Sequence, residues 1–120
     1  MPHIRLEYTE NIQTIIGSEL FDQLSKVIIQ TAKVKSQNCK SRAIKITNFH
    51  TGSKNDSEGF VHLEVKILKG RSEEIRNQIG MKSLKVLQTY FKDNKSVDYI
   101  QYSMEIQEMK QEDYFTTNNI

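Results

Sequence analysis

Pro2 is the residue in this 120-residue chain whose type and position point most directly to chemistry, and it is the only proline. When proline directly follows the initiator methionine, aminopeptidases readily remove Met1, and we expect that processing here. The nitrogen of Pro2 would then be a rigid secondary amine, not an amide. An amine with a pKa near the working pH can act as a general base. The alternative is that Met1 is retained and Pro2 is an ordinary residue.

Three cationic residues are candidates to surround that amine: Arg71, Arg42 and Lys40. Arginine forms forked, bidentate pairs with planar carboxylates. The same cations, together with partial burial, would lower the pKa of the amine by disfavouring its charged form. Ser72 adds the N–H groups of a helix start. The set indicates a substrate that carries carboxylates. The alternative for Arg71 is a solvated side chain beside a helix start.

The remaining reactive residue types have simpler interpretations. Cys39 lies in a polar run, residues 35–40, and we expect it not to act as a nucleophile. His3 and His62 fall on the same predicted strand face, so a two-histidine metal site is conceivable, but the sequence offers no convincing third ligand. We favour packing, or pairing with Glu64, for these histidines.

Composition and length exclude several classes of protein. Charged residues make up 27% of the chain and the formal net charge is +2, so there is no basic stripe typical of nucleic-acid binding. The apolar runs are too short to span a bilayer, and no secretory segment follows Met1. A single cysteine excludes an internal disulfide and fits a cytoplasmic protein. The length predicts one domain, residues 1–120.

Periodicity supplies the elements that must position these residues. Alternation of apolar and polar residues predicts four strands, at residues 2–8, 42–49, 60–68 and 99–109. Residues 50–59 read as a polar loop, and residues 110–120 as a tail that is disordered unless it docks.

Helical spacing predicts two helices. The first runs over about residues 18–31, capped by Ser18 or starting a turn earlier. The second runs over residues 73–92, after Ser72 as N-cap, with a Lys-rich solvated side. The expected buried face of the first helix is Phe21, Leu24, Val27, Ile28 and Thr31, and that of the second is Ile75, Ile79, Leu84, Leu87 and Phe91.

The order of elements predicts an α+β fold made of two βαβ units, which start at Pro2 and Phe60. Each crossover should be right-handed, with its two strands parallel, so that both helices cover one face of a four-stranded mixed sheet. If the first strands of the units meet antiparallel, Arg71, Arg42 and Lys40 gather with Pro2 at one rim. The opposite face of the sheet carries charges of both signs, which could face water or a partner subunit: His3, Arg5, Glu7, His62, Glu64 and Lys66.

Several segments, taken in order, resemble the 5-carboxymethyl-2-hydroxymuconate isomerase family of the tautomerase superfamily. They are Met1-Pro2-His3, Lys40-Ser41-Arg42, Phe60-Val61-His62, Gly70-Arg71-Ser72 and the Asn118-Asn119 pair. The resemblance covers nearly the whole chain. It implies a tautomerase-like β-α-β-β-α-β subunit, a homotrimer, and no metal or organic cofactor.

The resemblance also implies a reaction, in which a dienol becomes its conjugated 2-oxo isomer during homoprotocatechuate degradation, a pathway of aromatic compound breakdown. Pro2 would take the proton from the 2-hydroxyl and return one to carbon. Arg71 would bind a substrate carboxylate or polarise the developing oxo group. Arg42, with Lys40, would hold anionic substrate, within one subunit or across a subunit boundary.

Two residues depart from the pattern of the family and leave alternatives open. Lys40 stands where family members have arginine, and lysine cannot form the same forked pair. Lys45 replaces a histidine that is common just after that motif. The chain could therefore be a tautomerase, decarboxylase or hydratase relative that acts on another 2-oxo acid. A third hypothesis is a non-catalytic α/β assembly module that retains Met1.

Overall fold

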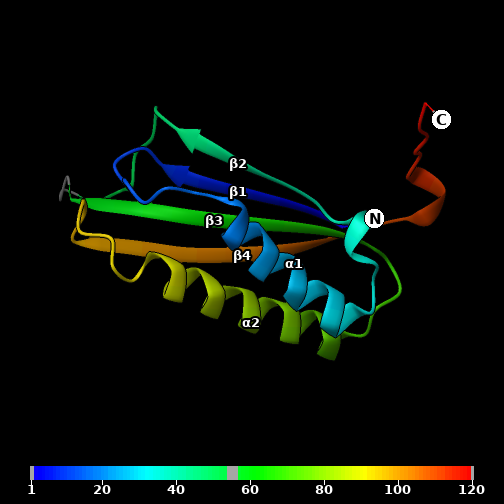
Figure 1. Ribbon diagram of the computed structural model, residues 1–120. Coiled ribbons are helices and arrows are strands. Elements are labelled where there is room, and N and C mark those ends of the chain that lie inside the picture. The colour runs from blue at the N-terminus through cyan, green and yellow to red at the C-terminus, as the bar shows by residue number, and fades with distance from the viewer. Residues whose placement is uncertain (1, 54–56, 120) are drawn as a thin grey trace.

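One mixed four-stranded sheet with two helices packed on the same face makes up the described part of the chain (Figure 1). The computed structural model describes residues 2–53 and 57–119. Its elements, in chain order, are β1 (His3–Thr9), α1 (Ser18–Ala32), the 3₁₀ turn η1 (Ser36–Asn38), β2 (Lys40–Ile46), β3 (Glu58–Leu68), α2 (Glu73–Phe91), β4 (Tyr99–Met109) and the 3₁₀ turn η2 (Gln111–Asp113).

The strand order is β2-β1-β3-β4. β1 runs parallel to β2, β3 runs parallel to β4, and the central pair β1 and β3 is antiparallel. The predicted fold, two βαβ units in one four-stranded mixed sheet, is therefore confirmed, and the units meet through their first strands. Because the units are related in this way, the starts of β1 and β2 lie beside the ends of β3 and β4. These strand ends form one rim of the sheet, which is the edge meant below.

The core lies between the sheet and the two helices. β1 and β3 alternate as predicted, and their inward side chains, such as Leu6 and Leu63, are fully buried. Each helix buries one row at every fourth residue: Leu20, Leu24, Ile28 and Ala32 on α1, and Ile79, Ser83, Leu87 and Phe91 on α2. Both predicted faces were wrong in part. On α1, Phe21, Val27 and Thr31 flank that row and are only partly buried. On α2, Ile75 and Leu84 are only partly buried, and Ser83 belongs to the row.

Several predicted boundaries need correction, and one cap is confirmed. β1 spans His3–Thr9 and not residues 2–8, and β3 begins at Glu58, within the predicted loop. β2 was expected over residues 42–49 but spans Lys40–Ile46, because Ile46 pairs with the last residue of β1 and the strand has no partner beyond it. Ser18 is the first helical residue of α1; the N-cap is Gly17, with no side-chain cap. Ser72 does cap α2, since its hydroxyl accepts the Ile75 N–H at 3.2 Å.

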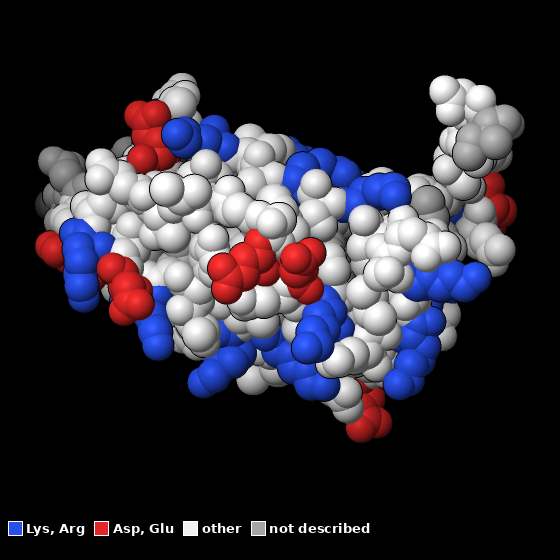
Figure 2. All heavy atoms as spheres, in the orientation of Figure 1, with Lys and Arg blue, Asp and Glu red and all other residues white. Residues whose placement is uncertain are grey.

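Figure 2 shows Lys and Arg side chains along the side of the molecule formed by α2 and at the end where the chain begins in Figure 1. On α2, Lys82 and Lys85 are exposed, as expected for a solvated helix side. Within the described residues, no helix has the length and apolar character needed to cross a membrane.

Candidate active site

The predicted rim is the edge of the sheet where the chain begins. His3, at the start of β1, pairs with Lys40 at the start of β2 and with Lys66 near the end of β3. The Lys40 N–H donates to the Pro2 carbonyl at 3.1 Å, so Pro2 lies directly beside the start of β2. Figure 1 shows the C-terminal segment leaving the sheet at the same edge. The topology thus brings the elements that carry the candidate residues together.

Pro2 lies on the helix-covered side of this edge. It is buried, and it precedes the alternation in which Ile4 and Leu6 face the helices. Burial around a secondary amine disfavours its protonated form. Removal of Met1 would therefore leave a free amine at this buried position.

Arg71 lies on the same side and links three elements. Its guanidinium donates to the Leu68 carbonyl at the end of β3 (3.4 Å) and to the Ala32 carbonyl at the end of α1 (3.3 Å). Gly70, with φ of 138°, makes the sharp turn between β3 and Arg71, a conformation that favours glycine. The Arg76 guanidinium in turn donates to the Arg71 carbonyl at 2.7 Å. Arg71 is thus a tethered residue of the rim, not a freely solvated one.

Arg42 and Lys40 lie on the opposite, open face. In the β1–β2 ladder Lys40 pairs with His3 and Arg42 pairs with Arg5, and paired residues point to the same side of a sheet. The Lys40 ammonium donates to the Gln37 carbonyl at 2.7 Å. The predicted cluster is therefore split within one copy of the chain. Its members share an edge, but Pro2 and Arg71 lie on one face and the other two cations on the other.

His3 connects Arg42 to the C-terminal segment, a contact that no sequence pattern indicated. Arg42 Nη1 lies 3.1 Å from His3 Nδ1, and the Tyr114 hydroxyl lies 2.9 Å from His3 Nε2. The two rings meet edge to face, with centroids 5.9 Å apart. Burial, followed by the neighbouring Arg42 charge, lowers the pKa of His3 below its ordinary value. The segment that was expected to be disordered unless it docks therefore docks on the rim through Tyr114.

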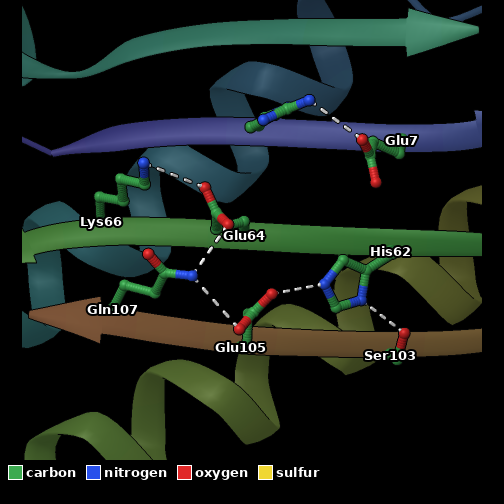
Figure 3. Close-up of polar contacts among 8 residues, drawn as sticks. Glu7, His62, Glu64, Lys66, Ser103, Glu105 and Gln107 are labelled. Carbon is green, nitrogen blue, oxygen red and sulfur yellow. Dashed lines mark hydrogen bonds and ion pairs between the residues drawn. The ribbon is translucent and has the colours of Figure 1, made fainter.

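A second polar network occupies the middle of the open face (Figure 3). His62 contacts the Ser103 hydroxyl (2.7 Å) and the Glu105 carboxylate (2.9 Å) of β4. Hydrogen bonds from His62 and then Gln107 lower the pKa of Glu105. The predicted pairing of His62 with Glu64 is therefore wrong. Glu64 is the next residue after His62 on the open face of β3. It instead contacts Lys66 (3.6 Å) and Gln107 (3.1 Å).

Ser103, His62 and Glu105 share the hydrogen-bond order of a hydrolytic triad, but they lie on regular strands. A serine nucleophile requires N–H groups that converge on the developing oxyanion, usually at a turn or helix start. The backbone of Ser103 is paired in the β3–β4 ladder at a central position. We therefore interpret the network as cross-strand pairing.

The hypothesis of a two-histidine metal site is not supported. His3 pairs with Lys66 and His62 pairs with Glu7, so the histidines are four positions apart along the sheet. At about 3.3 Å per residue, that separation is roughly 13 Å. Among the described residues, no cluster of three or more His, Cys, Asp or Glu side chains could hold a metal ion.

Cys39 lies between the end of α1 and β2, near the rim. Burial raises the pKa of its thiol, and a hydrogen bond with Ser25 opposes that shift only in part. A thiol with a raised pKa is a poor nucleophile because little thiolate is present at neutral pH. This supports the view that Cys39 takes no part in chemistry.

Comparison with known proteins agrees with this fold. The family profile described as 5-carboxymethyl-2-hydroxymuconate isomerase matches residues 2–120. A crystal structure of a 5-carboxymethyl-2-hydroxymuconate isomerase from Deinococcus radiodurans R1 is 29% identical, with a TM-score of 0.84 over 98% of this chain and 90% of that chain. No curated protein is significantly similar in sequence.

More distant structures share the fold alone. A 5-carboxymethyl-2-hydroxymuconate delta-isomerase is 13% identical, with a TM-score of 0.75 over 99% of this chain and 89% of that chain. A fused 4-OT described as a symmetric trimer is 8% identical, with a TM-score of 0.77 over 98% and 94%.

Proposed function

Because this chain belongs to the 5-carboxymethyl-2-hydroxymuconate isomerase family and is therefore an isomerase of the tautomerase superfamily, we propose that it converts 5-carboxymethyl-2-hydroxymuconate to its conjugated 2-oxo isomer. The reaction would serve homoprotocatechuate degradation. The observation that carries the proposal is the family match over residues 2–120, combined with the position of buried Pro2 at the sheet edge that also carries Arg71.

Pro2 is the proposed proton carrier. After removal of Met1, its neutral nitrogen takes the proton from the 2-hydroxyl of the dienol, and the protonated amine then returns a proton to carbon at the far end of the conjugated system. Oxygen loses one proton and carbon gains one, so the net reaction is an isomerisation and no metal or organic cofactor is required. Burial of Pro2 keeps the amine neutral enough to act as the base.

Arg71 is the proposed partner of the developing oxo group or of an adjacent carboxylate. A guanidinium has five N–H donors. Two of its nitrogens make the long contacts to Leu68 and Ala32, which hold the group at the rim and leave other N–H groups available. A preoriented cation stabilises charge that builds up on oxygen as the proton leaves.

We further propose a homotrimer in which Arg42, with Lys40, serves the site of a neighbouring subunit. Both residues lie on the open face, whereas Pro2 and Arg71 lie on the helix side of the same subunit. A closed ring of subunits would bring the open face of one beside the edge of the next. The trimeric description of the fused 4-OT structures supports this assembly. The single cysteine fits a cytoplasmic location.

The test is the rate of dienol conversion, followed by ultraviolet absorbance. Pro2→Ala should lower kcat/KM by about a hundredfold, within the usual range for loss of a general base. Circular dichroism should show that this variant stays folded. A Pro2→Ala enzyme with wild-type kcat/KM would rule out the mechanism.

Mixed trimers test the origin of Arg42. Pro2→Ala and Arg42→Ala proteins, each poorly active alone, are unfolded together and refolded. If Arg42 acts across the boundary, about a quarter of the sites in a random equimolar mixture combine an intact Pro2 with an intact Arg42 from the next subunit. Recovery of activity supports the proposal. Activity that stays at the level of the separate variants places Arg42 and Pro2 of one subunit in the same site.

A second candidate is the same proton transfer on another 2-hydroxy or 2-oxo acid. The observation that favours it is Lys40, a point charge in place of a forked guanidinium at the substrate-binding position. A panel of 2-oxo acids that differ in the number and spacing of carboxylates distinguishes the two candidates. Higher kcat/KM for a substrate without the carboxymethyl group would favour the second.

A further inference from the structure

We propose that His3 is a positioning residue for Arg42. Tyr114 of the C-terminal segment holds the His3 ring in the tautomer that can accept from Arg42, the neutral ring with its proton on Nε2. The inference rests on the proposed function, in which Arg42 binds substrate. It assigns a role to two residues that do not themselves touch substrate. It also explains why a segment 111 residues away in sequence docks on the first residue of β1.

The identity of the partners fixes the protonation state of the ring. A guanidinium only donates hydrogen bonds, so His3 Nδ1, 3.1 Å from Arg42 Nη1, must accept. The proton of the neutral ring is therefore on Nε2, which donates to the Tyr114 hydroxyl oxygen at 2.9 Å. The other neutral tautomer and the protonated ring both place an N–H against the Arg42 N–H. Only the neutral ring with its proton on Nε2 makes both contacts.

The charges that face His3 favour this neutral state. They are Arg42 and Lys40 on β2 and Lys66 on β3, all positive, while Tyr114 faces it from the C-terminal segment. Burial is the largest cause of the lowered His3 pKa, followed by Arg42. The ring therefore stays neutral, and able to accept from Arg42, to a lower pH than an ordinary histidine.

Arg42 needs such a partner because it lies on an exposed edge strand. β2 is exposed along most of its length, so a long side chain there has many rotamers open to it. Its neighbour across the ladder is Arg5, a like charge, which pairs with Glu7 at 3.2 Å. Without the His3 acceptor, the nearest ladder neighbour of Arg42 repels it. The contact to His3 therefore orients the guanidinium before substrate arrives.

The first test is independent of activity. Nitrogen-15 NMR of the imidazole side chains reports tautomer and pKa for each histidine. We expect His3 as the Nε2-protonated tautomer at neutral pH, titrating below the ordinary histidine range. Tyr114→Phe removes the acceptor of the Nε2 proton, so the share of the Nε2-protonated tautomer should fall. A His3 ring protonated at neutral pH, or on Nδ1, overturns the proposal.

The second test separates KM from kcat. His3→Leu should raise KM about tenfold, as expected when a charged hydrogen-bonding group loses its orientation, and leave kcat within about twofold. His3→Asn should restore KM, because its Oδ1 accepts at the place of Nδ1. In the wild type, KM should rise as pH falls through the lowered pKa of His3, because the protonated ring can no longer accept. In His3→Asn that rise should be absent.

The outcomes distinguish this inference from the proposed function. If Pro2→Ala is inactive but His3→Leu and His3→Asn both keep the KM of the wild type, the proposed reaction stands and the positioning role is wrong. If Pro2→Ala is fully active, the reaction mechanism is wrong, whatever state NMR finds for His3. Equal rises of KM in His3→Leu and His3→Asn also contradict the positioning role, since only one of them removes the acceptor.

Discussion

Substitution of Arg71 separates its structural contacts from its proposed catalytic role. Its two hydrogen bonds, to Ala32 and Leu68, are 3.3 and 3.4 Å long, beyond the usual range for N–H···O bonds. Arg71→Ala should therefore lower the free energy of unfolding by only about 1 kcal/mol. A domain with at least about 5 kcal/mol of stability stays almost entirely folded after such a loss.

The expected effect on activity is much larger. Removal of a preoriented donor to a developing oxyanion typically costs about 10²–10³-fold in rate, or about 2.7–4 kcal/mol. We expect kcat/KM of Arg71→Ala to fall in that range. Unfolding cannot account for a drop of this size, so the difference between the two energies measures the contribution of Arg71 to the reaction.

Arg76 is the matched control. It lies one turn into α2, donates to the Arg71 carbonyl at 2.7 Å, and pairs with Glu108 at 3.6 Å. Arg76→Ala should lose a similar stability, measured by urea unfolding at fixed protein concentration, and keep kcat/KM within about fivefold. The catalytic assignment is refuted if Arg71→Ala stays within fivefold of wild type. It is also refuted if both variants lose activity equally, since the position of the turn between β3 and α2 would then matter and not the charge of Arg71.

Two further predictions concern packing and the thiol. Gly59→Ala should lower the free energy of unfolding by about 1–3 kcal/mol, because its Cβ would lie 2.7 Å from Thr9 Oγ1, the acceptor for the Phe60 N–H. Gly80→Ala should instead raise the free energy of unfolding by about 0.5–1 kcal/mol, because its Cβ meets only Met104 Sδ, at 3.7 Å, in the interior of α2. Denaturant unfolding of both variants checks this contrast, and equal stabilities would contradict it. The raised pKa of the Cys39 thiol leaves less thiolate at a given pH, so iodoacetamide should alkylate it more slowly than a small free thiol, and Cys39→Ala should keep its activity. Rapid labelling that abolishes turnover would show that the thiol is reactive after all.

Local sequence patterns predicted the strands, helices and topology because those depend on periodicity. The alternation over β3 places Val61 through Ile67 on one face whatever the partner strand is. Ser72 caps α2 through a contact three residues away. Two βαβ units with short connections leave few topologies, and the observed order is one of them.

Details that depend on register between strands could not be predicted in the same way. His62 pairs with Glu105 and not Glu64, because the β3–β4 ladder sets Ser103 opposite His62, with Glu105 next along the same face. The assignment of Arg42 to the open face also required the β1–β2 pairing. Hence the sequence could place the candidate cations at one edge but not on the correct face.

The contact between Tyr114 and His3 illustrates a further limit. It joins the first strand to a C-terminal segment with no apolar periodicity, and neither residue type signals the other. Only the common edge shared by the start of β1 and the end of β4 brings them together. Long-range polar contacts of this kind follow from the completed fold and not from local sequence.

The most direct test of the proposed mechanism is nitrogen-15 NMR of native, untagged protein labelled at proline. The chain has a single proline, so the spectrum should contain one signal. We predict an amine resonance that titrates with pH, at a pKa below the ordinary range of an α-amine, together with an intact mass that lacks Met1. A signal from a tertiary amide that does not change with pH in the active enzyme would contradict the account.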